Sequence, residues 1–171
     1  MFENLQLKDN LPDIRKVDFI PIEKSYLLLQ LIKSLVIFGI FATGFFLFLI
    51  PKLKGEITNY IYLLYFILPL IYVLILGILI LGFFKKKYAI RQKDISFKKG
   101  VLVHSTTTIP FSRIQHIEID EGAFERIFKL ASLSIYTAGD NGRDLKISGI
   151  KKDKALQMKE LISNYLNDES E

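Results

Sequence analysis

The stretch Tyr60–Phe84, "YIYLLYFILPLIYVLILGILILGFF", runs for 25 residues without a single charge. A helix needs about 20 apolar residues to cross a hydrocarbon core of about 30 Å. A second uncharged run of 17 residues, Ser34–Ile50, precedes it and reaches spanning length if residues 26–33 join it. Lys33 suits that edge, because a lysine ammonium can reach the headgroups while its methylenes stay in lipid. The two runs predict a hairpin of two transmembrane helices over residues 26–84. A buried helix pair of a soluble protein and a cleaved signal peptide are the weaker alternatives.

Basic residues around the two runs predict the orientation in the membrane. The N-terminal flank carries Arg15, Lys16, Lys24 and Lys33, the C-terminal flank carries Lys85, Lys86, Lys87, Arg91 and Lys93, and the connection carries only Lys52 and Lys54. Both flanks lie on one side because two spans return the chain. The positive-inside rule therefore predicts a multi-pass membrane protein with both termini in the cytoplasm.

Composition excludes several kinds of site. The chain of 171 residues has no cysteine and two histidines, which excludes disulfides, Cys-ligated metals and a His-rich metal site. We expect no cofactor. The net charge is +5, but acidic residues are mixed among the basic ones after residue 85, which is a poor track for nucleic acid. A basic face suits anionic lipid headgroups better.

Two-residue alternation after the lysines predicts strands over much of residues 85–166. The alternating apolar positions are Tyr88 and Ile90, Ile95 and Phe97, a long strand from Val101 through Val103 to Ile109, Ile117 and Ile119, Leu133 and Ile135, and Leu145 and Ile147. A short amphipathic turn, "AFERIFK", separates two of them, and Asn141-Gly142 predicts a hairpin tip.

The end of the domain has the pattern of an amphipathic helix, from about Lys151 to Leu166. Its apolar stripe is Ala155, Met158, Leu161, Ile162 and Tyr165. The sequence thus predicts a polar lead-in (1–25), the helix hairpin (26–84), an α+β domain (85–166) of antiparallel strands whose open end the last helix covers, and an acidic tail (167–171).

The segment "IPFSRIQHIEI", residues 109–119, gathers a serine, an arginine and a histidine and so suggests an active site. Strand alternation points His116 outward with Glu118, and Ser112 precedes the strand in a bend set by Pro110. This spacing does not place a general base within hydrogen-bond distance of a nucleophile. We therefore expect no catalytic pair, and a structural role for Arg113, whose fork can bind carbonyls or a carboxylate at the bend.

The domain resembles the bacterial pleckstrin-homology (PH) domain family of YdbS-like membrane proteins. The matching residues are Tyr88, Ile90 and Arg91 at the entry, Asp94 and Gly100 in a hairpin, Ile109, Pro110, Arg113, Ile114, Gln115 and Ile117 in the signature, and Leu133, Ile135, Thr137, Ala138 and Gly139 in a later strand. The resemblance covers residues 85–166 by motif and the helix pair by architecture. It implies a PH-like antiparallel β-barrel capped by a C-terminal helix, with Pro110, Arg113 and Gln115 as a structural signature and no catalytic residue. It also implies a hetero-complex with a larger membrane protein that carries several such domains.

Two functions compete, and an enzyme of unknown type ranks third. The sequence favours a non-catalytic membrane protein whose PH-like domain is a protein-interaction and assembly module, as a homo-oligomer or with another PH-domain membrane protein. The alternative is a module that binds anionic lipid headgroups. Its candidate contacts are Lys85, Lys86, Lys87, Lys98 and Lys99, although the first three could serve only to anchor the helix.

Overall fold

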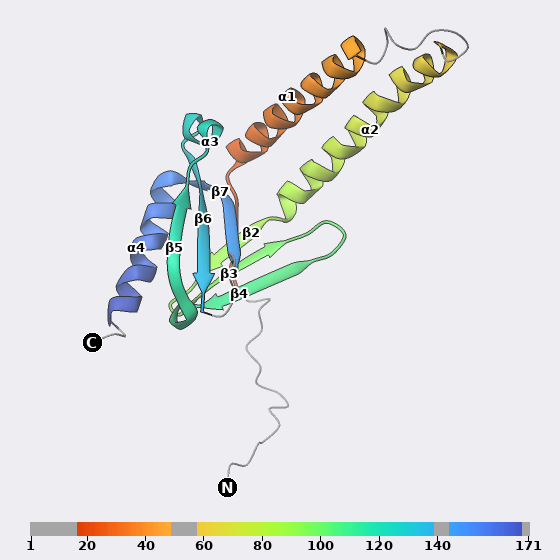
Figure 1. Ribbon diagram of the computed structural model, residues 1–171. Coiled ribbons are helices and arrows are strands. Elements are labelled where there is room, and N and C mark those ends of the chain that lie inside the picture. Colours follow the sequence, from red (N-terminus) through yellow and green to blue (C-terminus); the bar gives the residue numbers. More distant parts are fainter. Residues whose placement is uncertain (1–16, 49–57, 139–143, 169–171) are drawn as a thin grey trace, which may run out of the picture.

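The structure, a computed structural model, describes residues 17–48, 58–138 and 144–168. Two long helices, α1 (Lys24–Phe48) and α2 (Thr58–Lys85), leave one end of a domain made of two small sheets and a third long helix (Figure 1). The segments Lys24–Leu47 and Phe66–Lys85 are long and apolar enough to cross a membrane. Only 6% of the residues in an 18-residue apolar stretch of each segment are buried within the protein, so both helices present apolar side chains outward.

The first sheet holds both ends of the helix pair together. Its strands are β1 (Ile20–Pro21), β2 (Lys87–Ile90), β3 (Asp94–Lys99) and β4 (Ser105–Pro110), antiparallel and in that order. β1, just before α1, pairs with β2, just after α2, through Ile20 opposite Tyr88. The sequence analysis did not predict β1, because two residues carry no periodicity.

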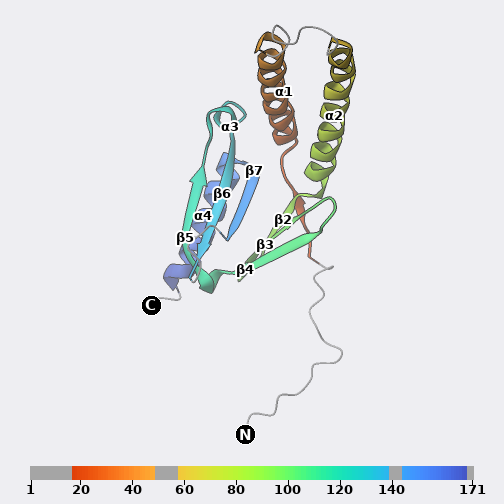
Figure 2. The same ribbon diagram turned by 45° about the vertical axis from the view of Figure 1, so that its right-hand side comes forward.

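The second sheet carries most of the core. It consists of β5 (Ile114–Asp120), β6 (Leu130–Thr137) and β7 (Leu145–Lys151) in that order, all antiparallel. The short helix α3 (Ala123–Ile127) connects β5 to β6, and α4 (Lys152–Asp168) follows β7 and packs against the sheet (Figure 2). Strand pairing of β6 with β7 confirms the predicted hairpin, whose tip Asn141-Gly142 lies outside the described residues.

Helix α4 covers the core much as its apolar stripe predicts. Ala155, Met158 and Ile162 are buried, and Tyr165 packs against the core from its edge. Leu161 is 47% exposed, so including it in the stripe was wrong. It lies just beyond the angular width that faces the sheet.

The long strand predicted from Val101 to Ile109 is also wrong. Gly100 has a φ of 123° and residues 101–103 bend, so that β4 begins only at Ser105. Leu102 and Val103 are 95% and 80% exposed. The prediction failed because the alternation of β-branched residues continues in the sequence across a turn. Gly100 allows this turn, since glycine tolerates a positive φ that other residues avoid.

Candidate functional site

Four lysines and a histidine surround one pocket at the end of the domain from which the helices emerge. The pocket has a volume of about 370 Å³ and is lined by Phe84, Lys85, Lys87, Lys98, Lys99 and His104. These residues come from the end of α2, from β2 and β3, and from the loop before β4. We call them the basic pocket.

Strand register explains why lysines distant in sequence meet there. Lys87 of β2 lies directly opposite Lys98 of β3, and cross-strand partners on one face are close neighbours. Lys99 lies opposite Ser105 at the start of β4, so the turn through Gly100 returns His104 to the same place. A Cβ on Gly100 would collide with the carbonyl oxygen of Val103, which shows how tightly this loop closes.

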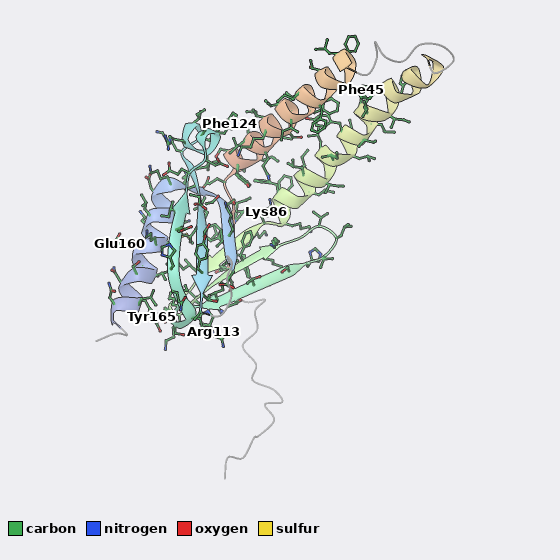
Figure 3. All side chains as sticks on the ribbon, in the orientation of Figure 1. Phe45, Lys86, Arg113, Phe124, Glu160 and Tyr165 are labelled. Carbon is green, nitrogen blue, oxygen red and sulfur yellow. The ribbon has the colours of Figure 1, made fainter. Side chains whose placement is uncertain are left out.

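Lys86, the fifth lysine predicted for headgroup contact, does not line the basic pocket. Its ammonium lies 5.6 Å from the centre of the Tyr26 ring at the start of α1, and Figure 3 labels it where the helices meet the domain. Burial lowers the pKa of Lys86, and the nearby charge of Lys99 lowers it further. Lys86 therefore packs between the helix start and the sheet.

The charges around the basic pocket are all of one sign. Within the described part of the chain, no aspartate or glutamate lines it. Lys98 also lies with its ammonium 5.7 Å from the centre of the Phe19 ring. Like charges held together repel one another, so an anion with several oxygens that binds among them relieves this repulsion. The pocket is chemically suited to a phosphate group.

Exposed apolar side chains border the basic pocket. Phe84 at the end of α2 is 62% exposed, and Leu102 and Val103 in the loop between β3 and β4 are also exposed. Figures 1 and 2 place the tip of this hairpin beside the end of α2. Apolar tips next to basic residues are typical of surfaces that bind the membrane interface.

The segment "IPFSRIQHIEI" lies elsewhere, and no described hydrogen bond joins Ser112 to His116. Both Ser112 and His116 are exposed, and the described hydrogen bond of the His116 ring goes to Glu118 at 3.1 Å. Glu118 also accepts a 2.8 Å hydrogen bond from the Tyr136 hydroxyl. This bond, followed by that from His116, lowers the pKa of Glu118. His116 thus belongs to an outward-facing group on the second sheet, as its alternation predicted.

The signature residues surround a short 3₁₀ turn, Phe111–Arg113, at the end of the domain away from the helices (Figure 3). Pro110 ends β4, and Arg113 and Gln115 are exposed on either side of buried Ile114. The Arg113 carbonyl accepts a hydrogen bond from the Ala138 amide. A role for its guanidinium in binding acceptors at the bend stays a prediction. Phe111 is fully buried against Tyr165, a core position that the sequence analysis missed.

A groove along the seam between α1 and α2 is a second candidate site. It has a volume of about 500 Å³, with Tyr26, Gln30, Lys33 and Tyr72 among its lining residues. The Ser34 hydroxyl donates to the Tyr72 hydroxyl at 3.5 Å. The side-chain oxygen of Gln30 is buried and has no hydrogen-bond partner within the described structure. Gln30 and Ser34 are one helical turn apart in an apolar segment, a signal that the sequence analysis did not use.

No group of three or more metal-ligating side chains occurs in the residues that the structure covers. The family model described as "Bacterial PH domain" matches residues 29–166 of the chain. The match begins inside α1 and leaves out β1, but it includes most of α1, all of α2, the strands β2 to β7 and most of α4. No curated protein and no solved structure matches the chain.

Proposed function

The chain belongs to the bacterial PH domain family, and from that premise we propose that it is a non-catalytic membrane protein whose basic pocket binds a phosphate-bearing anionic lipid headgroup. The observation that carries the proposal is the gathering of Lys85, Lys87, Lys98 and Lys99 around a pocket that no described carboxylate lines. The sequence favoured an assembly module because its basic residues alternate with acidic ones along the chain. In the folded protein the basic residues at this pocket are separated from the acidic ones. We therefore place the headgroup function ahead of the assembly function.

The proposal includes the membrane topology. We propose that α1 and α2 cross the bacterial inner membrane, with both termini in the cytoplasm and within the YdbS-like branch of the family. The pairing of β1 with β2 supports this, because it holds the chain before α1 and the chain after α2 on one side. Reporter fusions at Glu171 and at Lys54 test the orientation. Activity of a cytoplasmic reporter at Glu171, and of an external one at Lys54, is the expected result, and the reverse pattern overturns it.

Position relative to the bilayer makes the basic pocket suitable for a lipid. Phe84 and Lys85 end α2, so a headgroup at the surface of the same leaflet lies within reach of the pocket. Each basic residue near an anionic surface is worth about 1 kcal/mol, and the attraction fades within a Debye length of about 8–10 Å. Lysines act as point charges toward phosphate, so this pocket favours negative charge over a particular headgroup shape.

Retention of lipid by the full-length protein tests the headgroup function. The protein is released from nanodiscs of mixed phosphatidylglycerol and phosphatidylcholine, and bound lipids are counted by native mass spectrometry. We expect retained phosphatidylglycerol, lost with Lys98→Gln/Lys99→Gln and weakened by added salt. The matched control is Lys151→Gln/Lys159→Gln, which removes two exposed lysines outside the pocket. Equal retention by both double variants overturns the proposal.

Assembly is the second candidate, and the Gln30 side chain supports it. A buried amide oxygen without a partner is costly in an apolar surrounding, and polar side chains that bond across helices stabilise membrane helix association. A membrane helix of another copy, or of another PH-domain membrane protein, could donate that hydrogen bond from within the seam. We expect Gln30→Leu to reduce recovery of a partner after cross-linking in native membranes. Leu35→Ala, a lipid-exposed change on the same helix, is the control and should leave it unchanged.

A further inference from the structure

The short helix α3 presents two large apolar side chains to the outside. Phe124 is 45% exposed and Ile127 is 74% exposed, three residues apart on a helix of five residues. Single exposed apolar residues are ordinary on protein surfaces. These two stand out by their place, because α3 lies at the helix end of the domain, beside α1 (Figures 1 and 3).

An ion pair fixes α3 to the first long helix. The Lys33 ammonium donates to the Glu125 carboxylate at 2.7 Å, across 92 positions of sequence. The same ammonium lies 5.8 Å from the centre of the Phe124 ring. Lys33 is the last charge before the uncharged run that starts at Ser34. The pair therefore places α3 near the level at which the apolar part of α1 begins.

Charges around α3 favour an anionic surface as its partner. The nearby carboxylates have partners within the protein: Glu125 with Lys33, Glu121 with Lys152, and Asp120 with the Ser134 hydroxyl and Lys146. Arg126 and Lys129, by contrast, are exposed. Apolar side chains flanked by basic ones are typical of segments that lie in the interface of an anionic bilayer.

We infer that α3 is a second membrane contact, which inserts Phe124 and Ile127 into the same leaflet that the helices enter. The tip of the β3–β4 hairpin, which carries the exposed Leu102 and Val103, lies beside the end of α2, whereas α3 lies beside α1 (Figures 1 and 2). The domain therefore meets the leaflet at two separate places. The Lys33–Glu125 ion pair holds α3 in this position. The inference rests on the proposed membrane anchoring, and it explains how a basic pocket at one side is kept against the headgroups.

The absence of tryptophan from the chain permits a direct test in the full-length protein. Single variants Ile127→Trp, Leu156→Trp and Leu74→Trp are placed in nanodiscs of phosphatidylglycerol and phosphatidylcholine, with and without brominated acyl chains. We expect Ile127→Trp to show blue-shifted emission that brominated lipid quenches. Leu156→Trp, on the exposed side of α4, should show neither effect.

Leu74→Trp separates this inference from the proposed function. Leu74 is exposed in the middle of α2, and quenching there reports that the helix lies in the bilayer. Quenching at position 74 without quenching at 127 overturns the inference about α3 alone. Absence of quenching at 74 overturns the membrane anchoring itself. Blue-shifted but unquenched emission at 127 means that a protein, such as a second copy, covers α3 and also overturns the inference.

The role of the Lys33–Glu125 ion pair is tested in the Ile127→Trp background. We expect Glu125→Gln and Lys33→Gln each to lower the quenching toward that of Leu156→Trp. The exchanged pair, Lys33→Glu with Glu125→Lys, should restore it, since attraction between the two positions is regained. Two results overturn this role of the ion pair: quenching that is unchanged in the single variants, or quenching that the exchanged pair does not restore.

Discussion

The two ends of the domain use exposed and buried side chains in opposite ways. At the end away from the helices, apolar Phe111 is fully buried against Tyr165, and polar Ser112 and Arg113 face outward. At the helix end, apolar Leu102 and Ile127 face outward among basic residues. The first arrangement is typical of a surface in water, and the second is the kind of surface on which the proposed membrane contact rests. The sequence motif that first suggests chemistry lies at the end away from the helices, around the buried Phe111.

The largest effect is expected from Phe111→Ala at the end away from the helices. Removing a fully buried phenylalanine costs about 3–5 kcal/mol in free energy of unfolding, because transfer energy is lost and a cavity remains. Denaturant unfolding of the full-length protein in detergent measures it. The contrast is Leu102→Ala at the helix end, which should change stability by no more than about 0.5 kcal/mol. Similar losses in the two variants would contradict the distinction between the ends.

Gly100→Ala is expected to affect both stability and lipid retention. The positive φ of Gly100 and the closeness of the Val103 carbonyl leave no room for a methyl group, so the loop must shift at a cost of about 1–3 kcal/mol. His104 and the lysines then lose their common pocket, and retention of phosphatidylglycerol falls. Gly77→Ala is the control, since nothing lies within 4 Å of an added Cβ there. Unchanged retention in Gly100→Ala would show that the loop does not shape the pocket.

Acid should weaken the contact of α3 with the membrane. The hydrogen bond from Lys33 lowers the pKa of Glu125 against the opposing effect of burial. A lowered carboxyl pKa contributes stability that is present above the ordinary value of 4.5 and is lost as the pH falls through the lowered value. We expect lipid quenching of Ile127→Trp to decrease in that range.

The control for the acid effect is Glu125→Gln. Asp120, Glu121 and Lys146 face the same pocket as Glu125. The Gln variant removes the contribution of Glu125 alone. A decrease of the same size in both proteins would assign the acid effect to the other carboxylates.

The smallest effects are expected from the residues that resemble an active site. Ser112→Ala and His116→Ala should each change the free energy of unfolding by about 0.5 kcal/mol or less, because both side chains are exposed. Lipid retention should stay unchanged. Loss of a cellular phenotype in either variant, with membrane levels equal to those of the unchanged protein, would revive an enzymatic function.

Local patterns predicted the elements of the fold well. The uncharged runs predicted α1 and α2, alternation predicted β2, β3, β5, β6 and β7, and a stripe at helical spacing predicted α4. Each of these signals repeats over several residues of one segment. Where a signal lasts only two or three residues, prediction failed: β1 was missed, and Val101 and Val103 were assigned to a strand across a glycine turn.

The sequence did not predict how the lysines proposed for headgroup contact group in space. Lys85, Lys87, Lys98 and Lys99 line one pocket, whereas Lys86 turns toward Tyr26 and His104 joins the lysines. Adjacent lysines look equivalent in a sequence. Their side chains point in different directions because successive residues of a strand face opposite sides of the sheet. The register of β2 with β3 places Lys87 next to Lys98.

The sequence by itself determined the classes of element, the apolar lengths of the two helices and the family resemblance, because these depend on composition and periodicity within single segments. Only the tertiary structure decided which charges meet. Lys33 contacts Glu125, Lys87 lies opposite Lys98, and Ile20 pairs with Tyr88 across the whole helix hairpin. Such contacts depend on how distant segments pack, and no local periodicity encodes the distance between two segments that fold against each other.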